Sequence, residues 1–455
     1  MNTKPARGMR DFLPSDVRRR QYVIGVIADV YQRYGFEPLE TPAVENIETL
    51  MGKYGEEGDR LIFKILKRGE EGRTGEADLA LRYDLTVPLA RVIAEYRATL
   101  PRHFKRYQVQ PVWRADRPQK GRFREFYQCD VDAIGSTSMV IEAELLAAAA
   151  DVLTALGFER FTIRLNHRRL LAGMLESVGV PTDAHDAALV ALDKLDKIGR
   201  DGVAREFETR GIPETAATTL LELFGAIARA EATADTDPQR FNAEVLARLE
   251  GLVSGHSAGA LATQSLGELL TLLGNHAAAG FVRLDPSLAR GLSYYTGSIF
   301  EIAVTDLAGS LGGGGRYDEL IGMFLGEQVP ACGISLGLER ILVVLGERNM
   351  FPAAVADTPA DVMVTMWNSD RAVDAMRLAG ELRQAGFRVD LYPEADKIGK
   401  QFKFADSRGI RFVAVVGDDE AARNEVAVKN LATGEQRAVP RADVAQLIRH
   451  GGATR

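Results

Sequence analysis

The sequence is poor in the residues that build disulfide frameworks and metal centres. Its 455 residues include only two cysteines, Cys129 and Cys332, and six histidines. Two cysteines are too few for a disulfide framework, and neither the cysteines nor the histidines have the spacing of a zinc site or of an HExxH motif. We therefore expect no structural metal ion and a fold that is not held by disulfides.

Long apolar runs are also missing. No stretch approaches the roughly 20 apolar residues that cross a bilayer, and the first residues, MNTKPARGMRDFLPSD, have no apolar core of the signal-peptide type. These absences predict a cytoplasmic protein. A net charge of −7 argues against a passive coat on nucleic acid, although local basic patches can still contact RNA phosphates. The length suits about two to four domains.

The most informative stretch runs from Phe104 to Gly135. Two runs of strand-like alternation flank a turn-rich segment there, which predicts a long antiparallel hairpin. In the second strand, the period of two puts Phe126, Gln128 and Asp132 on one face. Hydrogen-bonding groups beside an aromatic ring are typical of a small-molecule pocket rather than of a sheet exterior.

The turn of this hairpin carries positive charge. It contains five basic residues, Arg114, Arg117, Lys120, Arg122 and Arg124, against the acidic residues Asp116 and Glu125. Such a turn suits an anion, because guanidinium and ammonium groups bind phosphate and carboxylate oxygens. A solvated basic turn is the alternative that these residues leave open.

A carboxylate and a hydroxyl face together upstream of the hairpin. In the segment LRYDLTVPLARV, Asp84 and Thr86 are two residues apart and so lie on one side of an extended chain. Together they can hold an ammonium group. Thr86 can equally cap a helix that has Pro88 in its first turn, and the two interpretations are compatible.

Three segments downstream of the hairpin carry arginine, tyrosine and glycine. In LARGLSYYTGSIFE, Gly291 leaves room for Arg290 to approach a ligand, and Tyr294 and Tyr295 begin a strand. The segment GGGGRY lacks the GK[ST] of a P-loop, so we predict a tight turn between strands there. ACGISLGLERILVVL passes from a strand to a helix with Arg340 in its first turn.

The remaining sequence divides by composition. Residues from about 167 to 280 are rich in Ala, Leu and Glu with helical periodicity, which predicts a helical insertion. A Pro- and Ala-rich linker follows at residues 351–358. Residues 359–455 alternate strands with helices as an α/β unit. One predicted helix of this unit carries lysines at helical spacing, which suit either RNA or a solvated face.

In their order along the chain and in their residues, these motifs resemble those of class II aminoacyl-tRNA synthetases. The hairpin resembles motif 2, and the segment around Arg340 resembles motif 3. RGLSYY is similar to the RGLDYY signature of the histidyl-tRNA synthetase family, from which it departs at Ser293. The resemblance implies an α+β class II catalytic domain, an antiparallel sheet with flanking helices, over residues 1–350. Residues 359–455 resemble the α/β anticodon-binding domain found in this family.

The resemblance implies a histidine–tRNA ligase, which uses ATP to form histidyl-adenylate and transfers the histidine to the 3′ end of tRNA(His). It also implies Mg²⁺ and a homodimer. The alternative within this fold is the synthetase-like regulatory subunit of ATP phosphoribosyltransferase, a histidine sensor without catalysis. That subunit lacks the C-terminal domain that residues 359–455 predict here.

The resemblance also assigns roles to individual residues. Arg114 and Arg290 are expected to be catalytic, since activation requires positive charge around the α-phosphate. Asp132 and Tyr295 are expected to read the imidazole nitrogens. The histidine-binding set is Asp84, Thr86, Arg114, Gln128, Asp132, Arg290, Tyr294 and Tyr295; the ATP-binding set is Arg114, Arg122, Phe126 and Arg340; the tRNA-binding set is Gln119, Lys397, Lys400 and Lys403.

Overall fold

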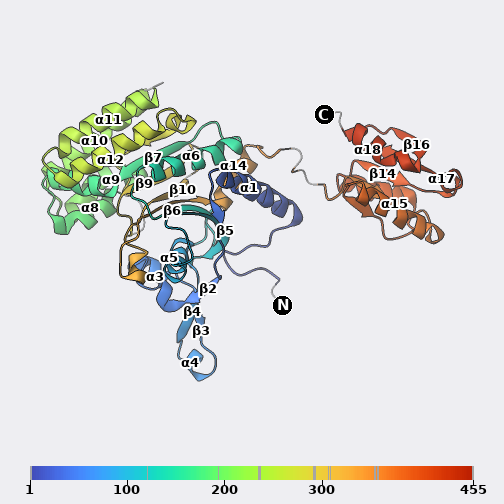
Figure 1. Ribbon diagram of the computed structural model, residues 1–455, viewed down its shortest axis with the longest axis horizontal. Coiled ribbons are helices and arrows are strands. Elements are labelled where there is room, and N and C mark those ends of the chain that lie inside the picture. The colour runs from blue at the N-terminus through green and yellow to red at the C-terminus, as the bar shows by residue number, and fades with distance from the viewer. Residues whose placement is uncertain are drawn as a thin grey trace. The chain divides into compact units, whose positions relative to one another are not determined.

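The computed structural model describes residues 3–119, 121–192, 194–233, 237–289, 294–305, 307, 309–352, 355 and 358–452. The chain forms two compact units, Met1–Phe351 and Pro352–Arg455 (Figure 1). Each unit has buried hydrophobic clusters of its own. The predicted linker lies partly outside the described residues, and its limits stay a prediction.

The first unit is built on an eight-stranded sheet in the order β1-β5-β6-β11-β10-β9-β7-β8. Its strands are β1 (Glu37–Pro38), β5 (Phe104–Trp113), β6 (Glu125–Ile134), β11 (Ala331–Gly337), β10 (Ser310–Arg316), β9 (Ser298–Ala303), β7 (Thr162–His167) and β8 (Val282–Leu284). All neighbours from β5 to β7 are antiparallel, whereas the outer pairs β1·β5 and β7·β8 are parallel. The predicted hairpin is the β5–β6 pair.

Three helices pack against one face of this sheet: α1 (Pro14–Arg33), α6 (Val140–Ala155) and α14 (Leu338–Glu347). Apolar residues of α1 such as Ile27 recur at helical spacing and join one core with Cys129 and Val131, the odd-numbered side chains of β6. Because side chains alternate along a strand, the even-numbered ones face the opposite side. That side meets the start of α5 (Thr86–Glu95), where Arg106 contacts the Leu85 carbonyl.

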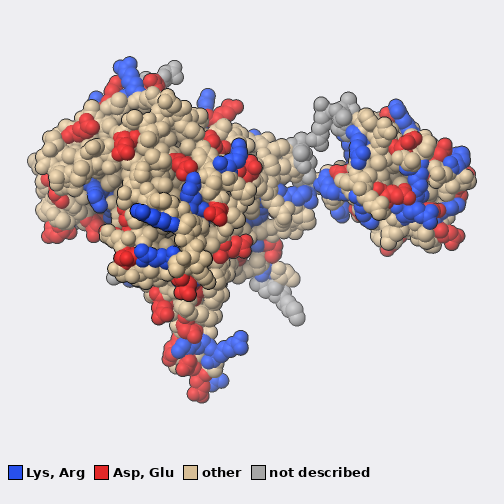
Figure 2. Space-filling view, viewed as in Figure 1, with Lys and Arg blue, Asp and Glu red and all other residues tan. Residues whose placement is uncertain are grey.

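Smaller elements complete the first unit. A three-stranded sheet and four short helices are formed by β2 (Val44–Asn46), β4 (Ala77–Leu81), β3 (Lys64–Leu66), α2 (Ile47–Leu50), α3 (Gly55–Arg60), α4 (Glu70–Arg73) and α13 (Gly322–Leu325). The hairpin that carries α4 at its tip projects from the rest of the unit in Figure 1. In Figure 2, side chains of both charges cover this projection.

The segment between β7 and β8 is helical. Its helices are α7 (Arg168–Ser177), α8 (His185–Leu192), α9 (Leu195–Thr209), α10 (Glu214–Thr233), α11 (Pro238–Val253) and α12 (Ser257–Leu273). They gather at one end of the first unit in Figure 1. Their leucine and alanine side chains are continuous with the core beneath the large sheet.

The segment GGGGRY is part of a strand, so the predicted tight turn is wrong. Gly312–Gly315 lie within β10, paired with β11 on one side and β9 on the other. A Cβ at Gly314 would collide with the Gly333 carbonyl, and one at Gly313 would lie 2.9 Å from the Phe300 carbonyl. The glycines therefore permit close approach of the neighbouring strands. Glycine is frequent both in turns and at such close contacts, so the sequence alone does not distinguish the two.

The second unit contains a five-stranded sheet in the order β13-β12-β14-β15-β16. Its elements are β12 (Val362–Val364), α15 (Ala372–Gln384), β13 (Val389–Leu391), α16 (Ile398–Ser407), β14 (Phe412–Val415), α17 (Asp418–Arg423), β15 (Glu425–Asn430), β16 (Gln436–Pro440) and α18 (Val444–Gly452). The predicted succession of strands and helices is present, and α17 is an addition to it. In neither unit do the described residues include a helix long and apolar enough to cross a membrane.

Candidate active site

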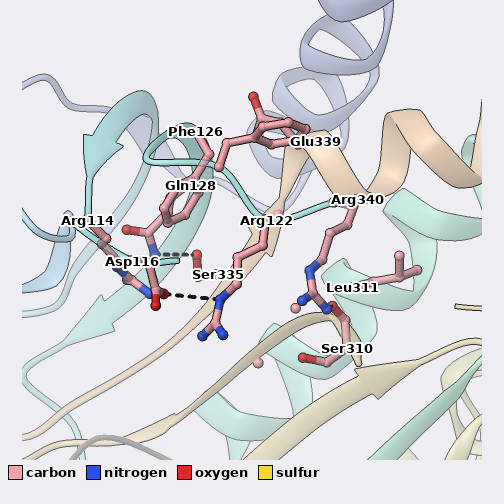
Figure 3. A pocket seen from close by; sticks show the side chains of 15 residues that line it. Arg114, Asp116, Arg122, Phe126, Gln128, Ser310, Leu311, Ser335, Glu339 and Arg340 are labelled. Atoms are coloured by element: carbon pink, nitrogen blue, oxygen red, sulfur yellow. Dashed lines mark hydrogen bonds and ion pairs between the residues drawn. The ribbon is translucent and has the colours of Figure 1, made fainter. Parts of the chain in front are cut away.

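A cavity of about 250 Å³ opens over the large sheet where β6, β11 and β10 are neighbours. The structure brings together here five residues of the predicted sets: Arg114, Arg122, Phe126, Gln128 and Arg340 (Figure 3). Phe126 and Gln128 reach the cavity from the even-numbered face of β6, as predicted. Ser310 to Gly313 of β10 and Ser335 of β11 form the opposite wall.

Guanidinium groups border this cavity on opposite sides, Arg114 on one and Arg340 on the other (Figure 3). The Arg114 guanidinium lies 4.3 Å from the Tyr83 ring centre and 5.1 Å from that of Phe126, and its Nε donates to the Tyr83 carbonyl at 3.1 Å. Arg340 Nη1 donates to the Ser310 carbonyl at 2.5 Å. These contacts hold both guanidinium groups at the cavity wall, with that of Arg114 beside two aromatic rings, an arrangement that suits a nucleoside phosphate.

Arg122 and Asp116 form a partly exposed rim of the same cavity. The Arg122 Nε lies 3.1 Å from Asp116 Oδ2, and the Arg122 side chain is 51% exposed. An ion pair at such exposure is weak, so Arg122 can exchange its partner for a phosphate at small cost. Figure 3 shows its guanidinium directed into the space that Arg340 also borders.

Glu339 fixes the helix that presents Arg340. Its buried carboxylate accepts from Arg20 of α1 at 2.8 Å and from the Tyr127 backbone N–H of β6 at 2.9 Å. These bonds tie the first turn of α14 to both α1 and the sheet. Arg340, the next residue, is thereby positioned at the cavity.

A second group of polar side chains is buried beside this cavity and does not line it. The two are joined through the cavity wall, because Ser335 is hydrogen bonded to both Gln128 and Asp130. Asp84 is 1% exposed, and its Oδ1 accepts from the Tyr54 hydroxyl at 2.9 Å and from the Val87 N–H at 3.1 Å. Asp84 therefore binds the first turn of α5 through the Val87 N–H, while Leu85 occupies the N-cap position and Thr86 is the first helical residue. The capping role predicted for Thr86 is thus wrong, and its hydroxyl is hydrogen bonded to that of Tyr294. Thr86 still lies close to Asp84, as the spacing predicts, because both residues are at the start of α5.

Asp132 is bound on two sides. Its Oδ1 accepts a short hydrogen bond from the Tyr317 hydroxyl, and its Oδ2 lies 2.9 Å from Arg106 Nη2. Burial raises the pKa of Asp132, while Arg106 and Tyr317 act in the opposite direction. Gly333 lies directly across from Asp132 in the register of β6 and β11, and leaves the space that the carboxylate occupies.

The tyrosines of the RGLSYY signature lie near these carboxylates. Tyr294 is buried with its ring 5.2 Å from that of Tyr295 and 6.0 Å from that of Tyr317. The Tyr295 ring lies against the Gly315 backbone of β10, where a Cβ would approach it to 3.1 Å. Arg290, predicted to be catalytic, lies outside the described residues.

Residues 8–341 match the family model described as Histidyl-tRNA synthetase, and residues 361–450 match that of the anticodon binding domain. The chain belongs to the histidyl-tRNA synthetase family. A curated histidine–tRNA ligase of Flavobacterium johnsoniae is 43% identical, with 96% of this chain and 97% of the relative covered. One of Gloeobacter violaceus is 42% identical, with 97% of each chain covered.

Solved structures of the histidyl-tRNA synthetase family have the same fold. That of histidyl-tRNA synthetase from Nostoc sp. PCC 7120 matches with a TM-score of 0.83 and 32% identity, covering 99% of this chain and 100% of that one. A Bacillus halodurans protein described as an ATP phosphoribosyltransferase regulatory subunit/histidyl-tRNA synthetase is 20% identical at a TM-score of 0.72, and shows the fold alone. The predicted class II catalytic fold with a C-terminal anticodon-binding domain is confirmed.

The residues predicted to bind tRNA are divided between the two units. Gln119 is exposed at the tip of the β5–β6 hairpin, where its backbone pairs with that of Arg122. Lys397, Lys400 and Lys403 are exposed along the start of α16 in the second unit. Lys400 is paired with Asp396 at 2.7 Å. On the face of the second unit that Figure 2 shows, basic and acidic side chains are intermingled.

Sequence reasoning missed four residues of the buried polar group: Tyr54, Arg106, Asp130 and Tyr317. A signal existed for Asp130, because the period of two places it between Gln128 and Asp132 on the same face. Arg106 could be found only from the hairpin register, which pairs it with Asp132. Tyr54 and Tyr317 come from segments whose approach to the site depends on tertiary packing.

Proposed function

We propose that this chain is a histidine–tRNA ligase, which activates L-histidine with ATP and transfers it to the 3′ end of tRNA(His). The observation that carries the proposal is that two chemically different regions are neighbours. Guanidinium groups and an aromatic ring line the cavity, and the buried carboxylates and phenols beside it, joined to its wall through Ser335, form what we call the carboxylate end. ATP and a cationic amino acid are the two ligands that such regions suit.

The carboxylate end suits a ligand with many N–H donors. Three buried oxygens there have no hydrogen-bond donor among the described residues: Asp84 Oδ2, Gln128 Oε1 and Asp130 Oδ1. A fourth, Asp132 Oδ2, has only its ion pair with Arg106. Leaving such an acceptor unpaired costs about 1–3 kcal/mol. Histidine supplies three N–H groups from its ammonium and one from its neutral imidazole. We assign the ammonium to Asp84, Thr86 and Gln128, and the imidazole to Asp132 and Tyr295, with Tyr294 supporting Thr86.

The chemistry follows from charge placement. The histidine carboxylate is ionised at neutral pH, so its attack on the α-phosphate of ATP needs no general base. Negative charge is rearranged at that phosphate in the transition state, and preorganised cations stabilise it. We assign this role to Arg114 and to Arg290. Arg340, Arg122 and Phe126 would hold the nucleotide by charge and stacking, and pyrophosphate would leave from the Arg340 side.

A magnesium ion held by protein carboxylates alone does not fit the described part of the site. Asp116 is paired with Arg122 and Glu339 with Arg20, and the described residues contain no group of three or more His, Cys, Asp or Glu that could hold a metal ion. We propose that Mg²⁺ enters with ATP, bound mainly through its phosphates. When bound, the ion would neutralise negative charge on the outer phosphates of ATP.

We further propose a cytoplasmic homodimer whose second unit recognises the tRNA. The dimer rests on residues 8–42, a helix followed by a proline-containing extended piece, which resemble motif 1 of class II synthetases, where a proline lies at the dimer interface. The cytoplasmic location rests on the first residues of the sequence, which have no apolar core of the signal-peptide type. The match of residues 361–450 to an anticodon binding domain supports tRNA recognition by that unit. We assign Lys397, Lys400, Lys403 and Gln119 to contacts with RNA phosphates.

The test is histidine-dependent exchange of labelled pyrophosphate into ATP, followed by charging of tRNA(His). We expect both activities. The alternative, a histidine-sensing regulatory subunit of ATP phosphoribosyltransferase, predicts histidine binding without exchange or charging. The second unit and the full-length curated relatives favour the ligase.

A further inference from the structure

Two carboxylates in the buried polar group share one guanidinium. Asp130 and Asp132 lie two residues apart on the same face of β6, and Arg106 Nη2 lies 2.9 Å from Asp132 and 3.9 Å from Asp130. The three side chains are almost inaccessible, with exposures of 0% for Arg106, 2% for Asp130 and 3% for Asp132. The closer carboxylate takes the ion pair, and the other is poorly neutralised.

Few other groups near Asp130 can stabilise the negative charge of its carboxylate. On β11, Ser335 lies opposite Asp130 and hydrogen bonds to it. The titratable groups that act on Asp130 from the adjoining elements are Arg106 on β5, Asp132 on β6, Asp84 before α5, Arg82 after β4, Tyr31 on α1, and the phenols of Tyr294 and Tyr295. Arg82 donates its hydrogen bonds to Thr41, Gln110 and Pro111. Within the described residues, Arg106 is therefore the cation that Asp130 and Asp132 share, and Asp130 Oδ1 has no donor.

We propose that Asp130 is a further histidine-binding residue, which holds a proton in the free site and releases it to solvent when a histidine N–H group reaches its unpaired Oδ1. The inference rests on the proposed function. The O–H bond of the Asp130 carboxyl breaks, the buffer takes the proton, and the carboxylate accepts the ligand's N–H. No group of the chain changes its oxidation state or its covalent bonds otherwise.

The proton follows from the charge balance. If both carboxylates ionise in the free site, one buried negative charge lacks a cationic partner among the described residues, which the low dielectric of the interior makes unfavourable. Burial accordingly raises the pKa of Asp130 to about 7, with Asp132 adding to the rise and Arg106 opposing it. Histidine brings a positive ammonium and N–H donors, and a donor to the charged form lowers a carboxyl pKa.

The sign of the pH dependence is therefore fixed. A carboxyl whose pKa falls on binding makes affinity increase as pH rises through the pKa of the free site, and makes no difference well below the pKa of the bound form. Asp130→Asn cannot ionise and imitates the protonated acid. The ratio of histidine Kd values, Asp130→Asn over parent, should grow from near one at pH 5.5 to about tenfold at pH 8.5, since tenfold corresponds to one pKa unit.

The experiment is calorimetric titration of L-histidine into the full chain between pH 5.5 and 8.5, for the parent, Asp130→Asn and the matched control Asp151→Asn. Asp151 lies on α6 and binds the Tyr34 hydroxyl, away from the site. The free imidazole titrates equally in all three titrations and cancels from the ratio. Asp151→Asn should follow the parent at every pH. A ratio for Asp130→Asn that stays constant with pH would overturn the inference.

A second measurement on the parent covers the case in which Asp130→Asn does not fold. Titrations at pH 7 in buffers of different ionisation enthalpy give the number of protons released. The free imidazole, with a pKa of about 6.5, can contribute at most about a quarter of a proton. Release clearly above that supports Asp130, and release at or below it overturns the inference. A parent that binds no histidine would instead contradict the proposed function.

Discussion

Gly333 on β11 lies directly opposite Asp132 on β6, and the Asp132 carboxylate occupies the space that a side chain at residue 333 would need. At this point β11 contributes only the backbone of Gly333, and β6 contributes the Asp132 carboxylate that lies over it. The same carboxylate is held by Arg106 and Tyr317, so its position is set from three directions.

Gly333→Ala should weaken histidine binding strongly while the chain still folds. Its methyl group would displace the Asp132 carboxylate from Arg106 and Tyr317, and unpaired buried polar groups cost about 1–3 kcal/mol each. We expect the KM for histidine in pyrophosphate exchange to rise about tenfold or more. Gly346→Ala is the matched control, because a Cβ there meets nothing within 4 Å. Equal KM values for both variants would remove Asp132 from the histidine pocket.

Tyr317→Phe should shift the pH dependence of histidine activation. The Tyr317 hydroxyl donates to Asp132 and so lowers the pKa of that carboxyl, which burial raises. Without the donor the pKa rises further, so the ionised carboxylate forms only at higher pH. The acid limb of the kcat/KM profile for histidine should move to higher pH, with the largest loss at low pH. Tyr34→Phe, which removes a hydroxyl bound to Asp151, should leave the profile unchanged.

Arg340→Ala should affect ATP rather than histidine. Hydrogen bonds to charged groups contribute about 1.5–3 kcal/mol, so the KM for ATP should rise about tenfold to a hundredfold. Calorimetry should show histidine affinity within about twofold of the parent, because the carboxylate end is built from other residues. Arg240→Ala, on the exposed surface of α11, serves as the control. A loss confined to histidine affinity would contradict the assignment of the two regions.

A chain that ends at Phe351 should retain pyrophosphate exchange and lose most tRNA charging. All residues assigned to activation lie in the first unit, and that unit has its own hydrophobic clusters. Circular dichroism should first establish that the truncated chain is folded. A folded truncated chain that loses exchange and charging to the same extent would show that the second unit takes part in activation.

Local patterns in the sequence predicted the elements that position the site. Alternation in residues 122–132 placed Gln128 and Asp132 on one face, and the structure shows that face toward the site, because the apolar odd-numbered residues must pack on α1. The change from a strand to a helix before Arg340 was likewise readable. Hydrophobic periodicity and turn-forming residues depend on only a few consecutive positions, so they can be recognised in the sequence without knowledge of tertiary contacts.

Tertiary structure alone decided which partners these residues meet. The sequence offered Asp132 as a carboxylate for imidazole, but only the register of β5 and β6 placed Arg106 beside it, and only packing brought in Tyr317. The glycines of β10 looked like a turn because their role, close approach of β9 and β11, depends on strands distant in sequence. The position of Arg106 between Asp130 and Asp132 also depends on tertiary structure. The sequence shows that these three charged residues are present, but the distances that decide whether Asp130 is protonated are set only when β5 and β6 pair.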